Sequence, residues 1–316
     1  MTSRALLIAI VCGLISALML AAPLRLGGLG AMLFLFAATP VCVSALGFGT
    51  KAGVISGLMG AIAFGAFLGP VNGISVFVFS LLPGIWAGHM AGLVSYDDGD
   101  ANWFPLSTIL TRLAFLAAGS VIAIGYINGL NGEGLNAYVN ESLTAMMTAA
   151  GEQNPNLAVP SQEQIGQSAA QIVGFFPMFA PAFLLITYVW NLSFGARIAR
   201  ANGWMLRPKD DIPSMTGVEL GLVGVFAAAL LISFFGGTVG LAAKVVAGAT
   251  GAALMLTGFA VLHDLTRGVA ARGLLLGTTY AFTFLTLIPA FFMLILGLVE
   301  TFTGLRARRG GPPSST

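Results

Sequence analysis

The sequence has few charged residues. Of its 316 residues, 8% are Asp, Glu, Lys or Arg, whereas 57% are hydrophobic. Soluble domains carry about 25% charged residues, so this chain lacks the polar surface that would cover a globule in water. The shortage argues against a soluble enzyme or a nucleic-acid-binding protein. It predicts a polytopic membrane protein in contact with lipid.

Residues that carry out catalysis or bind metals are also scarce. The two cysteines, Cys12 and Cys42, lie in separate apolar runs, and no Walker A, HExxH, GxSxG or CxxC motif occurs. The one acidic cluster, "YDDGD" at 96–100, lacks the second set of carboxylates that a magnesium–pyrophosphate site needs. We interpret it as a solvated turn. The sequence therefore predicts a protein that is not an enzyme and has no metal and no cofactor.

Nine apolar runs are long enough to cross about 30 Å of hydrocarbon as helices. They lie at 5–22, 29–48, 51–69, 73–94, 106–128, 172–194, 216–235, 239–262 and 273–299. These runs are apolar on every face, which does not suit a β-barrel. The sequence predicts an all-α, polytopic transmembrane bundle with an N-terminal part (1–128), an external loop (129–171), a C-terminal part (172–305) and a disordered basic tail (306–316).

The basic residues predict an orientation. The loop 129–171 contains no Lys or Arg, whereas the segment from Arg197 to Lys209 contains four. Because basic loops stay in the cytoplasm, the N-terminus is expected there and the loop 129–171 outside. A ninth span would place the basic tail outside, and a hairpin broken near Pro289 would return it inside. Both alternatives are open from the sequence.

The external loop has helical periodicity. Its apolar residues recur on one side of a helix at Leu135, Val139, Leu143, Met146, Met147 and Ala150. Ser161 and Gln164 have the spacing of a capping box and predict the start of the next helix. The amphipathic segment is expected to lie on the bilayer or to cap the bundle, either as an ordinary connection or as a lid.

Small residues recur every fourth position in the third apolar run, at Gly53, Gly57, Ala61, Gly65 and Gly69. Such a strip lets another helix approach its backbone closely, and lipid gives no competing hydrophobic drive. Two interpretations remain. The strip is a packing face inside this bundle, or it is a docking face for another membrane subunit.

Few polar residues lie at membrane depth. The candidates for substrate binding are Asn72, Trp86, His89 and Asn191. Trp86 and His89 are three residues apart and follow Pro83, which loosens a helix. The alternative is that they are an interfacial residue and an interhelical hydrogen bond. Four charged residues near predicted span ends are explained by snorkelling alone, namely Arg112, Glu219, Lys244 and Glu300. For His263, Asp264 and Arg267 we expect a local ion pair.

Three segments resemble a known family: "NLSFGARIARANG" at 191–203, "LTGFAVLHDLTRGVAARGLLLGTTYAF" at 256–282 and "LGLVETFTGLRARR" at 296–309. They are similar to the YybS-like family of bacterial inner-membrane proteins, whose function is unknown. More distantly, the chain is similar to the substrate-binding subunits of energy-coupling-factor transporters and to the rod-shape protein MreD. The resemblance implies the bacterial inner membrane and a transport-related, substrate-binding subunit without its own ATPase, needing other membrane subunits. The alternative it implies is a cell-envelope scaffold.

Overall fold

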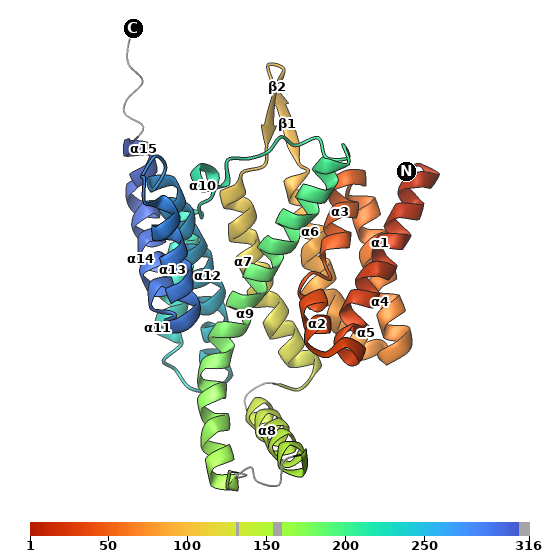
Figure 1. Cartoon of the computed structure of the whole chain (residues 1–316), viewed down its shortest axis with the longest axis vertical. Coiled ribbons are helices and arrows are strands. Elements are labelled where there is room, and N and C mark those ends of the chain that lie inside the picture. The colour runs from red at the N-terminus through yellow and green to blue at the C-terminus, as the bar shows by residue number, and fades with distance from the viewer. Residues whose placement is uncertain (131–132, 154–159, 310–316) are drawn as a thin grey trace.

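The chain is almost entirely helical (Figure 1). The computed structural model describes residues 1–130, 133–153 and 160–309. Within these ranges, the one sheet is a hairpin of two short strands. The predicted all-α class is therefore confirmed.

The N-terminal helices are short and are broken by glycine and proline. They are α1 (Ser3–Ala21), α2 (Pro23–Leu35), α3 (Thr39–Phe48), α4 (Thr50–Leu68), α5 (Pro70–Val76), the π-helical turn η1 (Phe77–Leu81) and α6 (Leu82–Ala91). Gly49 and Gly69 each have a positive φ, which side chains disfavour, and they separate α3 from α4 and α4 from α5. Pro70 then begins α5, where its missing N–H has no consequence.

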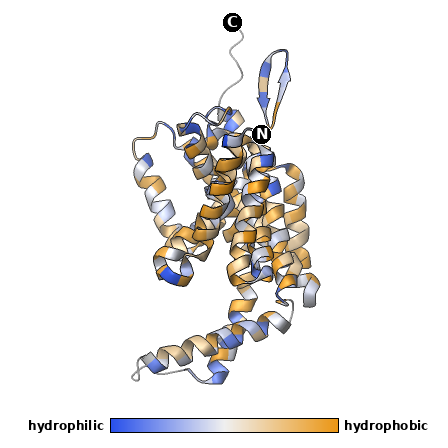
Figure 2. Cartoon of the chain, turned by 90° about the vertical axis from the view of Figure 1, so that its right-hand side faces the viewer, coloured by the Kyte–Doolittle hydropathy of each residue, from blue (hydrophilic) through white to orange (hydrophobic). Residues whose placement is uncertain are grey.

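The acidic cluster forms the tip of the hairpin. Strand β1 (Val94–Asp97) pairs antiparallel with β2 (Asp100–Trp103). Asp98 and Gly99 between them both have positive φ, as in the tight turns that suit a twisted hairpin. The hairpin extends beyond the helix ends, and hydrophilic residues are prominent on it while hydrophobic residues dominate the bundle helices (Figures 1 and 2).

The rest of the chain consists of longer helices. They are α7 (Leu106–Ile127), α8 (Glu133–Gln153), α9 (Gln162–Ala201), α10 (Ile212–Met215), α11 (Leu220–Ile232), α12 (Gly237–Leu265), α13 (Arg272–Thr286), α14 (Ile288–Thr303) and α15 (Leu305–Arg309). The predicted capping box is present, because Ser161 and Gln164 exchange side chain–backbone hydrogen bonds at the start of α9. The predicted amphipathic helix is α8, and it packs against α9.

The two ends of the bundle differ. The N-terminus, the hairpin, α10 and α15 lie at one end, here called the basic end, and α8 lies at the other (Figure 1). Within the described ranges, seven helical segments are long and apolar enough to cross a membrane, or eight if the bent pair α13–α14 is one span, so the predicted count of nine is not confirmed. The fold is thus that of a multi-pass membrane protein. Helix α11 has 13 residues, about 20 Å at 1.5 Å each, and is shorter than the predicted run 216–235.

The last predicted span is not one straight helix. Helices α13 and α14 meet at Leu287, where the chain bends by 117°. Leu287 has a positive φ, and Pro289 follows it in the first turn of α14. The bend returns the chain, so that α15 lies at the same end as the N-terminus (Figure 1). The break predicted near Pro289 is therefore the alternative that the structure adopts.

The tail prediction needs a correction. Residues Leu305–Arg309 form the short helix α15, whereas the sequence predicts disorder from residue 306. The Arg306 guanidinium donates to Glu300 at 2.8 Å and to the carbonyl of Pro213 at 2.7 Å, which holds this helix on the bundle. Residues 310–316 lie outside the described residues. Glu300 is buried in this ion pair, so snorkelling does not account for it.

Glycine permits the closest contacts between helices. A Cβ at Gly258 of α12 would overlap the carbonyl of Met293 in α14, and one at Gly297 of α14 would overlap the carbonyl of Leu254. Gly248 of α12 touches the backbone of α9 in the same way. Helix α12 is the most buried of the helices that are long enough to span a membrane.

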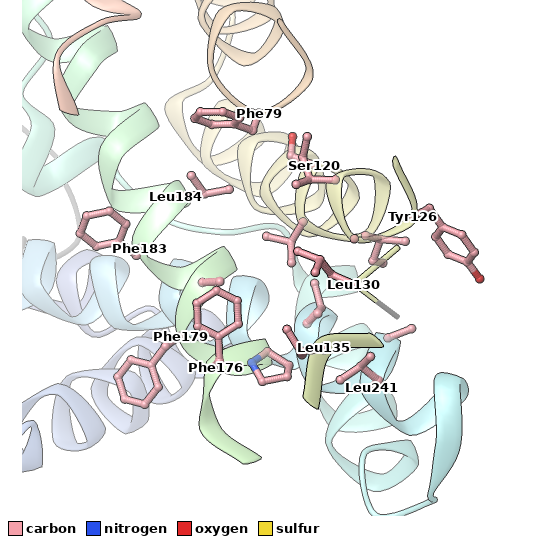
Figure 3. A pocket seen from close by; sticks show the side chains of 18 of the residues that line it. Phe79, Ser120, Tyr126, Leu130, Leu135, Phe176, Phe179, Phe183, Leu184 and Leu241 are labelled. Carbon is pink, nitrogen blue, oxygen red and sulfur yellow. The ribbon is translucent and has the colours of Figure 1, made fainter. Parts of the chain in front are cut away.

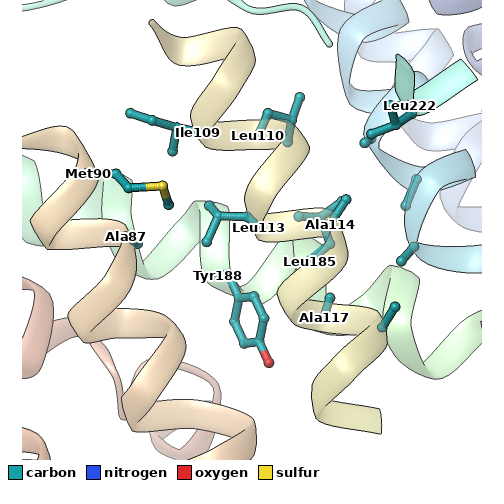
Figure 4. Packing of buried hydrophobic residues seen from close by; sticks show 14 of the residues in the cluster. Ala87, Met90, Ile109, Leu110, Leu113, Ala114, Ala117, Leu185, Tyr188 and Leu222 are labelled. Atoms are coloured by element: carbon teal, nitrogen blue, oxygen red, sulfur yellow. The ribbon is translucent and has the colours of Figure 1, made fainter. Parts of the chain in front are cut away.

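One core joins the two halves of the chain. Leu113 and Ala114 of α7 pack with Leu185 of α9 and Leu222 of α11, and α6 contributes Met90 (Figure 4). Helix α9 also packs against α3, and α12 against α7. The N-terminal part (1–128) and the C-terminal part (172–305) thus share a common core.

Candidate functional site

Asn191 is fully hydrogen-bonded inside the bundle. Its amide oxygen accepts from the Thr39 hydroxyl at 2.8 Å, and its nitrogen donates to the carbonyls of Leu35 and Thr187, both at 2.8 Å. The chain between α2 and α3 is not helical after Leu35, which frees that carbonyl. Asn191 therefore ties α9 to this break, and its hydrogen-bonding groups are used within the protein.

Trp86 and His89 are neighbours on α6, with their ring centroids 6.3 Å apart. The His89 Nδ1 lies 2.7 Å from the hydroxyl of Thr50, at the start of α4, and so links the two helices. The Trp86 side chain is 42% exposed and faces a groove on the side of the bundle. The two rings are adjacent, but His89 is not among the residues that line that groove.

Asn72 is exposed near the start of α5, and its amide donates to the carbonyl of Leu68. This bond joins neighbouring residues across the glycine that separates α4 from α5. Apart from the neighbouring rings of Trp86 and His89, the candidates for substrate binding are held at separate places, and the structure does not bring the four together in one pocket.

The small-residue strip of α4 faces this chain's own helices over its first half. A Cβ at Gly53 would lie 2.7 Å from the Cβ of Ala45 in α3. A Cβ at Gly57 would lie 2.6 Å from the end of the Ile85 side chain in α6. Both glycines are buried, so this part of the strip is occupied within the bundle.

The second half of the strip faces α5. A Cβ at Gly65 would lie 3.2 Å from the Cα of Gly73, and a Cβ at Gly73 would lie 2.8 Å from the carbonyl oxygen of Ala61. Gly69 follows the last residue of α4 and ends the helix. A second subunit would therefore meet a face that α3, α5 and α6 already cover.

A large apolar cavity, here called the chamber, lies between α7, α9 and α12 (Figure 3). Its volume is about 550 Å³. The helices contribute Phe79 from η1, Val121 and Ile124 from α7, Phe176, Phe179, Phe183 and Leu184 from α9, and Leu241 and Val245 from α12. Leu130 and Leu135 line it at the α8 end. None of the described residues that line it carries a charge.

Two prolines shape the α9 wall of the chamber. Pro177 and Pro181 lie inside the 40-residue helix and remove two backbone donors from it. The Phe176, Phe179 and Phe183 side chains follow at helical spacing and line the cavity. At Met178, between the prolines, α9 touches Gly248 of α12. This contact holds the two helices together directly beside the cavity.

A π-helical turn forms the opposite wall. Pro83 has no N–H to donate to the carbonyls four and five residues before it, Phe79 and Val78. These two carbonyls accept side-chain bonds instead. The Ser120 hydroxyl of α7 donates to Val78 at 3.0 Å, and the Tyr188 hydroxyl of α9 donates to Phe79 at 2.7 Å. Proline thus causes the bulge, and two neighbouring helices satisfy it.

The lining of the chamber is almost entirely apolar. Its polar groups are few, and the Ser120 hydroxyl is already committed to Val78. Tyr126 is 61% exposed, and its ring points away from the cavity (Figure 3). Within the ranges that the structure describes, no group of three His, Cys, Asp or Glu side chains could hold a metal ion. A molecule in the chamber would be held by the shape of the cavity and by contact with apolar side chains.

Sequence reasoning missed the chamber, although one signal was present. The segment "FFPMFAPAF" at 175–183 places two prolines among aromatic residues inside an apolar run. Prolines in membrane helices are tolerated where neighbouring groups compensate for the lost hydrogen bonds. That pattern marks a locally irregular helix, but it does not say which other helices face it.

Ion pairs gather at the basic end. Arg207 is buried, and its guanidinium binds Asp210 as well as the carbonyl of Phe104 at 2.9 Å. Arg267 pairs with Asp264 at 3.0 Å, as the sequence predicts, and also with Asp211. Hydrogen bonds from Arg267 and Ser214 hold the pKa of the Asp211 carboxyl below its ordinary value. These bonds attach the connection between α9 and α11 to the rest of the bundle.

Comparison of the chain with protein-family models, curated proteins and solved structures found no match. The resemblance to the YybS-like family stays a prediction.

Proposed function

We propose that this protein is a transport-related membrane subunit that binds an apolar small molecule in the chamber and has no ATPase of its own. The observation that carries the proposal is the cavity of about 550 Å³ between α7, α9 and α12. Ligand pockets are commonly about 300–1,000 Å³ and mostly apolar, with a few polar groups. The chamber falls in this class.

The lining predicts the chemistry of the ligand. Aromatic rings from α9 offer flat apolar contact, and no charged side chain is available among the described lining residues to pair with an ionic group. Burying an unpaired charge is costly, so the part of the ligand inside the chamber is uncharged. An aliphatic chain or a fused-ring molecule meets these conditions.

The surroundings of the chamber fit a protein that takes up and releases its ligand. Leu135 of α8 contributes to the wall, and α8 rests on α9 through one amphipathic face. Because Leu135, in the first turn of α8, lines one end of the cavity, displacement of α8 would widen that end. The sequence has no Walker A motif, so the energy for such a step would come from partner subunits.

Ligand retention tests the proposal. Gently solubilised wild-type protein should retain one small apolar molecule per chain, detected by mass spectrometry. Ala242→Phe fills the chamber and should reduce this occupancy at least about tenfold. Ala228→Phe, on an exposed position of α11, is the matched control and should retain the molecule. If the filled variant unfolds, Ala180→Phe on the α9 wall replaces it. A wild-type protein without a stoichiometric molecule, or equal occupancy in all variants, would contradict the proposal.

A scaffold is the second candidate, and the hairpin favours it. The strands β1 and β2 project beyond the bundle, and Tyr96 on them is 72% exposed. A partner could pair with an edge of this hairpin. Replacing residues 95–102 by a short Gly-Ser linker should then remove co-purifying proteins while the retained small molecule is unchanged.

A further inference from the structure

A groove on the side of the bundle adjoins the chamber. It has a volume of about 440 Å³ and lies between α6 with its preceding π-turn and α7. Trp86 and Arg112 line its upper part, toward the basic end, and Val78, Leu116, Gly119 and Ser120 line the rest. The groove therefore has a cationic and aromatic end at Arg112 and Trp86, and the rest of it is mostly apolar.

Arg112 is the unusual residue in this groove. It is exposed, and it makes no ion pair with any of the described residues; its guanidinium lies 5.1 Å from the centre of the Phe104 ring. By contrast, Arg207 is buried and bonded to Asp210. A cation on the membrane-facing side of a span is costly unless it reaches the interface or a negative partner. Snorkelling toward the nearby helix end places it among lipid headgroups, where a phosphate is that partner.

The depth of Arg112 matches one leaflet. Arg112 is the seventh residue of α7, about 9 Å from its first residue at 1.5 Å each. Ser120 lies eight residues further, about 12 Å along the helix axis, which is close to the roughly 15 Å thickness of half the hydrocarbon core. A lipid with its phosphate at Arg112 would thus place an acyl chain beside Gly119 and Ser120. Basic pockets between membrane helices are known sites for anionic headgroups.

A single wall separates the groove from the chamber. Ser120 lines both cavities, Val78 lines the groove, and Phe79 lines the chamber. The wall is the π-turn of η1, which the Ser120–Val78 and Tyr188–Phe79 hydrogen bonds hold in place. Because Pro83 has no N–H, this turn lacks part of the regular helical hydrogen bonding. The two side-chain hydrogen bonds take its place and hold the wall in position.

We propose that the groove binds an anionic phospholipid through Arg112, and that its acyl chain reaches the chamber across the wall formed by Ser120 and η1. The membrane then supplies the apolar molecule to the chamber from the side. This inference rests on the proposed function, since it names the ligand class of the same chamber and its route. The acyl chain supplies the uncharged part that the chamber accepts, while the phosphate stays outside at Arg112.

Two variants test the groove without disturbing the core. Gly119→Leu places a side chain into the groove, where a Cβ meets no other atom within 4 Å, so the fold should tolerate it. Arg112→Gln removes the charge, and Arg112→Lys keeps it. The matched controls are Gly277→Leu, an open helical glycine on α13, and Arg25→Gln, an exposed arginine on α2.

The probe is phosphatidylglycerol with a photoreactive diazirine at the end of one acyl chain, incorporated into nanodiscs with the full-length protein. In the wild type, light should attach it to chamber peptides that contain Phe176, Phe179 or Phe183. Labelling should fall at least about tenfold in Gly119→Leu and Arg112→Gln, and Arg112→Lys should restore much of it. Both controls should label as the wild type does. The same probe built on phosphatidylcholine, which has no net charge, should label the chamber less.

Three results would overturn the inference. The first is unchanged chamber labelling in both groove variants. The second is labelling of groove peptides alone in the wild type, because the chain would then stop at the wall. The third is equal labelling by the anionic and neutral probes. Failure of the proposed function looks different, since the wild type would then retain no small molecule and a chamber-filling Ala242→Phe would change neither retention nor labelling.

Discussion

At the scale of single residues, close contact between helices depends on glycine, which lacks the Cβ that every other residue carries. Gly258 and Gly297 lie where α12 and α14 meet backbone to backbone. Lipid is as apolar as the core, so helices in a membrane gain stability from such close packing rather than from leaving water. The same contact recurs where Gly13 of α1 meets the carbonyl of Ser56 in α4.

Gly258→Ala should destabilise the protein, because the added Cβ would overlap the carbonyl oxygen of Met293 and backbone must move. Overpacking costs about 1–3 kcal/mol and more where a backbone cannot yield. Gly221→Ala in α11 is the control, since a Cβ there meets nothing within 4 Å. Thermal unfolding in detergent should show a clear loss for Gly258→Ala and none for Gly221→Ala. Equal melting temperatures would show that α12 and α14 are not in backbone contact.

At the scale of elements, breaks in the helices are as informative as the helices themselves. Pro83 produces the π-turn, and Ser120 and Tyr188 satisfy the carbonyls it leaves. The break after Leu35 is satisfied by Asn191 in a comparable way. These two irregular backbone segments are thus paired with polar side chains from other helices, as the low dielectric of a membrane requires.

The connection between α9 and α11 gives a pH-dependent prediction. The pKa of Asp211 is lowered from 3.8 by its bonds to Arg267 and Ser214. A carboxyl with a depressed folded-state pKa stabilises the fold above its unfolded pKa, and this contribution is lost as the pH falls through the folded value. Asp211→Asn should therefore lower the melting temperature at pH 7, and the difference from wild type should shrink as the pH falls below about 4.

The measurement is a pair of unfolding curves at each pH, for wild type and Asp211→Asn. Asp98→Asn at the hairpin tip serves as the control, because that carboxylate has no ion-pair partner among the described residues. Asp211 is exposed, so salt should reduce the effect. A difference between wild type and Asp211→Asn that stays constant from pH 7 to pH 3 would show that the Arg267 bond does not contribute.

At the scale of the whole molecule, the two ends differ in charge. The segments that carry Arg207, Arg267 and Arg306 meet at the basic end, and α8, without any Lys or Arg, lies at the other (Figure 1). The bend at Leu287 brings α15 to the basic end. All these basic segments can then lie on the same side of the membrane, and the distribution of basic residues predicts that this side is the cytoplasm.

Fusions to alkaline phosphatase, which is active only outside the cytoplasm, test this arrangement. A fusion at Gly151 in α8 should be active, and fusions at Gly203 and after Arg309 should be inactive. The last fusion is decisive for the bent pair, because a single straight span from 273 to 299 would make it active. Activity at Gly203 together with silence at Gly151 would reverse the orientation.

The sequence by itself determined the features that depend on neighbours within a turn or two. The apolar runs mark the long helices, Ser161 and Gln164 mark the start of α9, and Asp264 with Arg267 forms an ion pair on one helix end. Such interactions depend on helical spacing alone, so they can be predicted without knowing the fold.

Only the tertiary structure decided which faces are buried. Helices α11 and α12 are both apolar on every side, yet α12 is largely buried and α11 is mostly exposed. In a water-soluble protein, an apolar stripe on a helix marks the face that is buried. In a membrane, the lipid and the protein core are both apolar, so a helix can be apolar on every face and its buried face is not marked. The partners of Asn191, the wall at Ser120 and the chamber therefore could not be inferred, because each depends on residues from helices that are distant in the sequence.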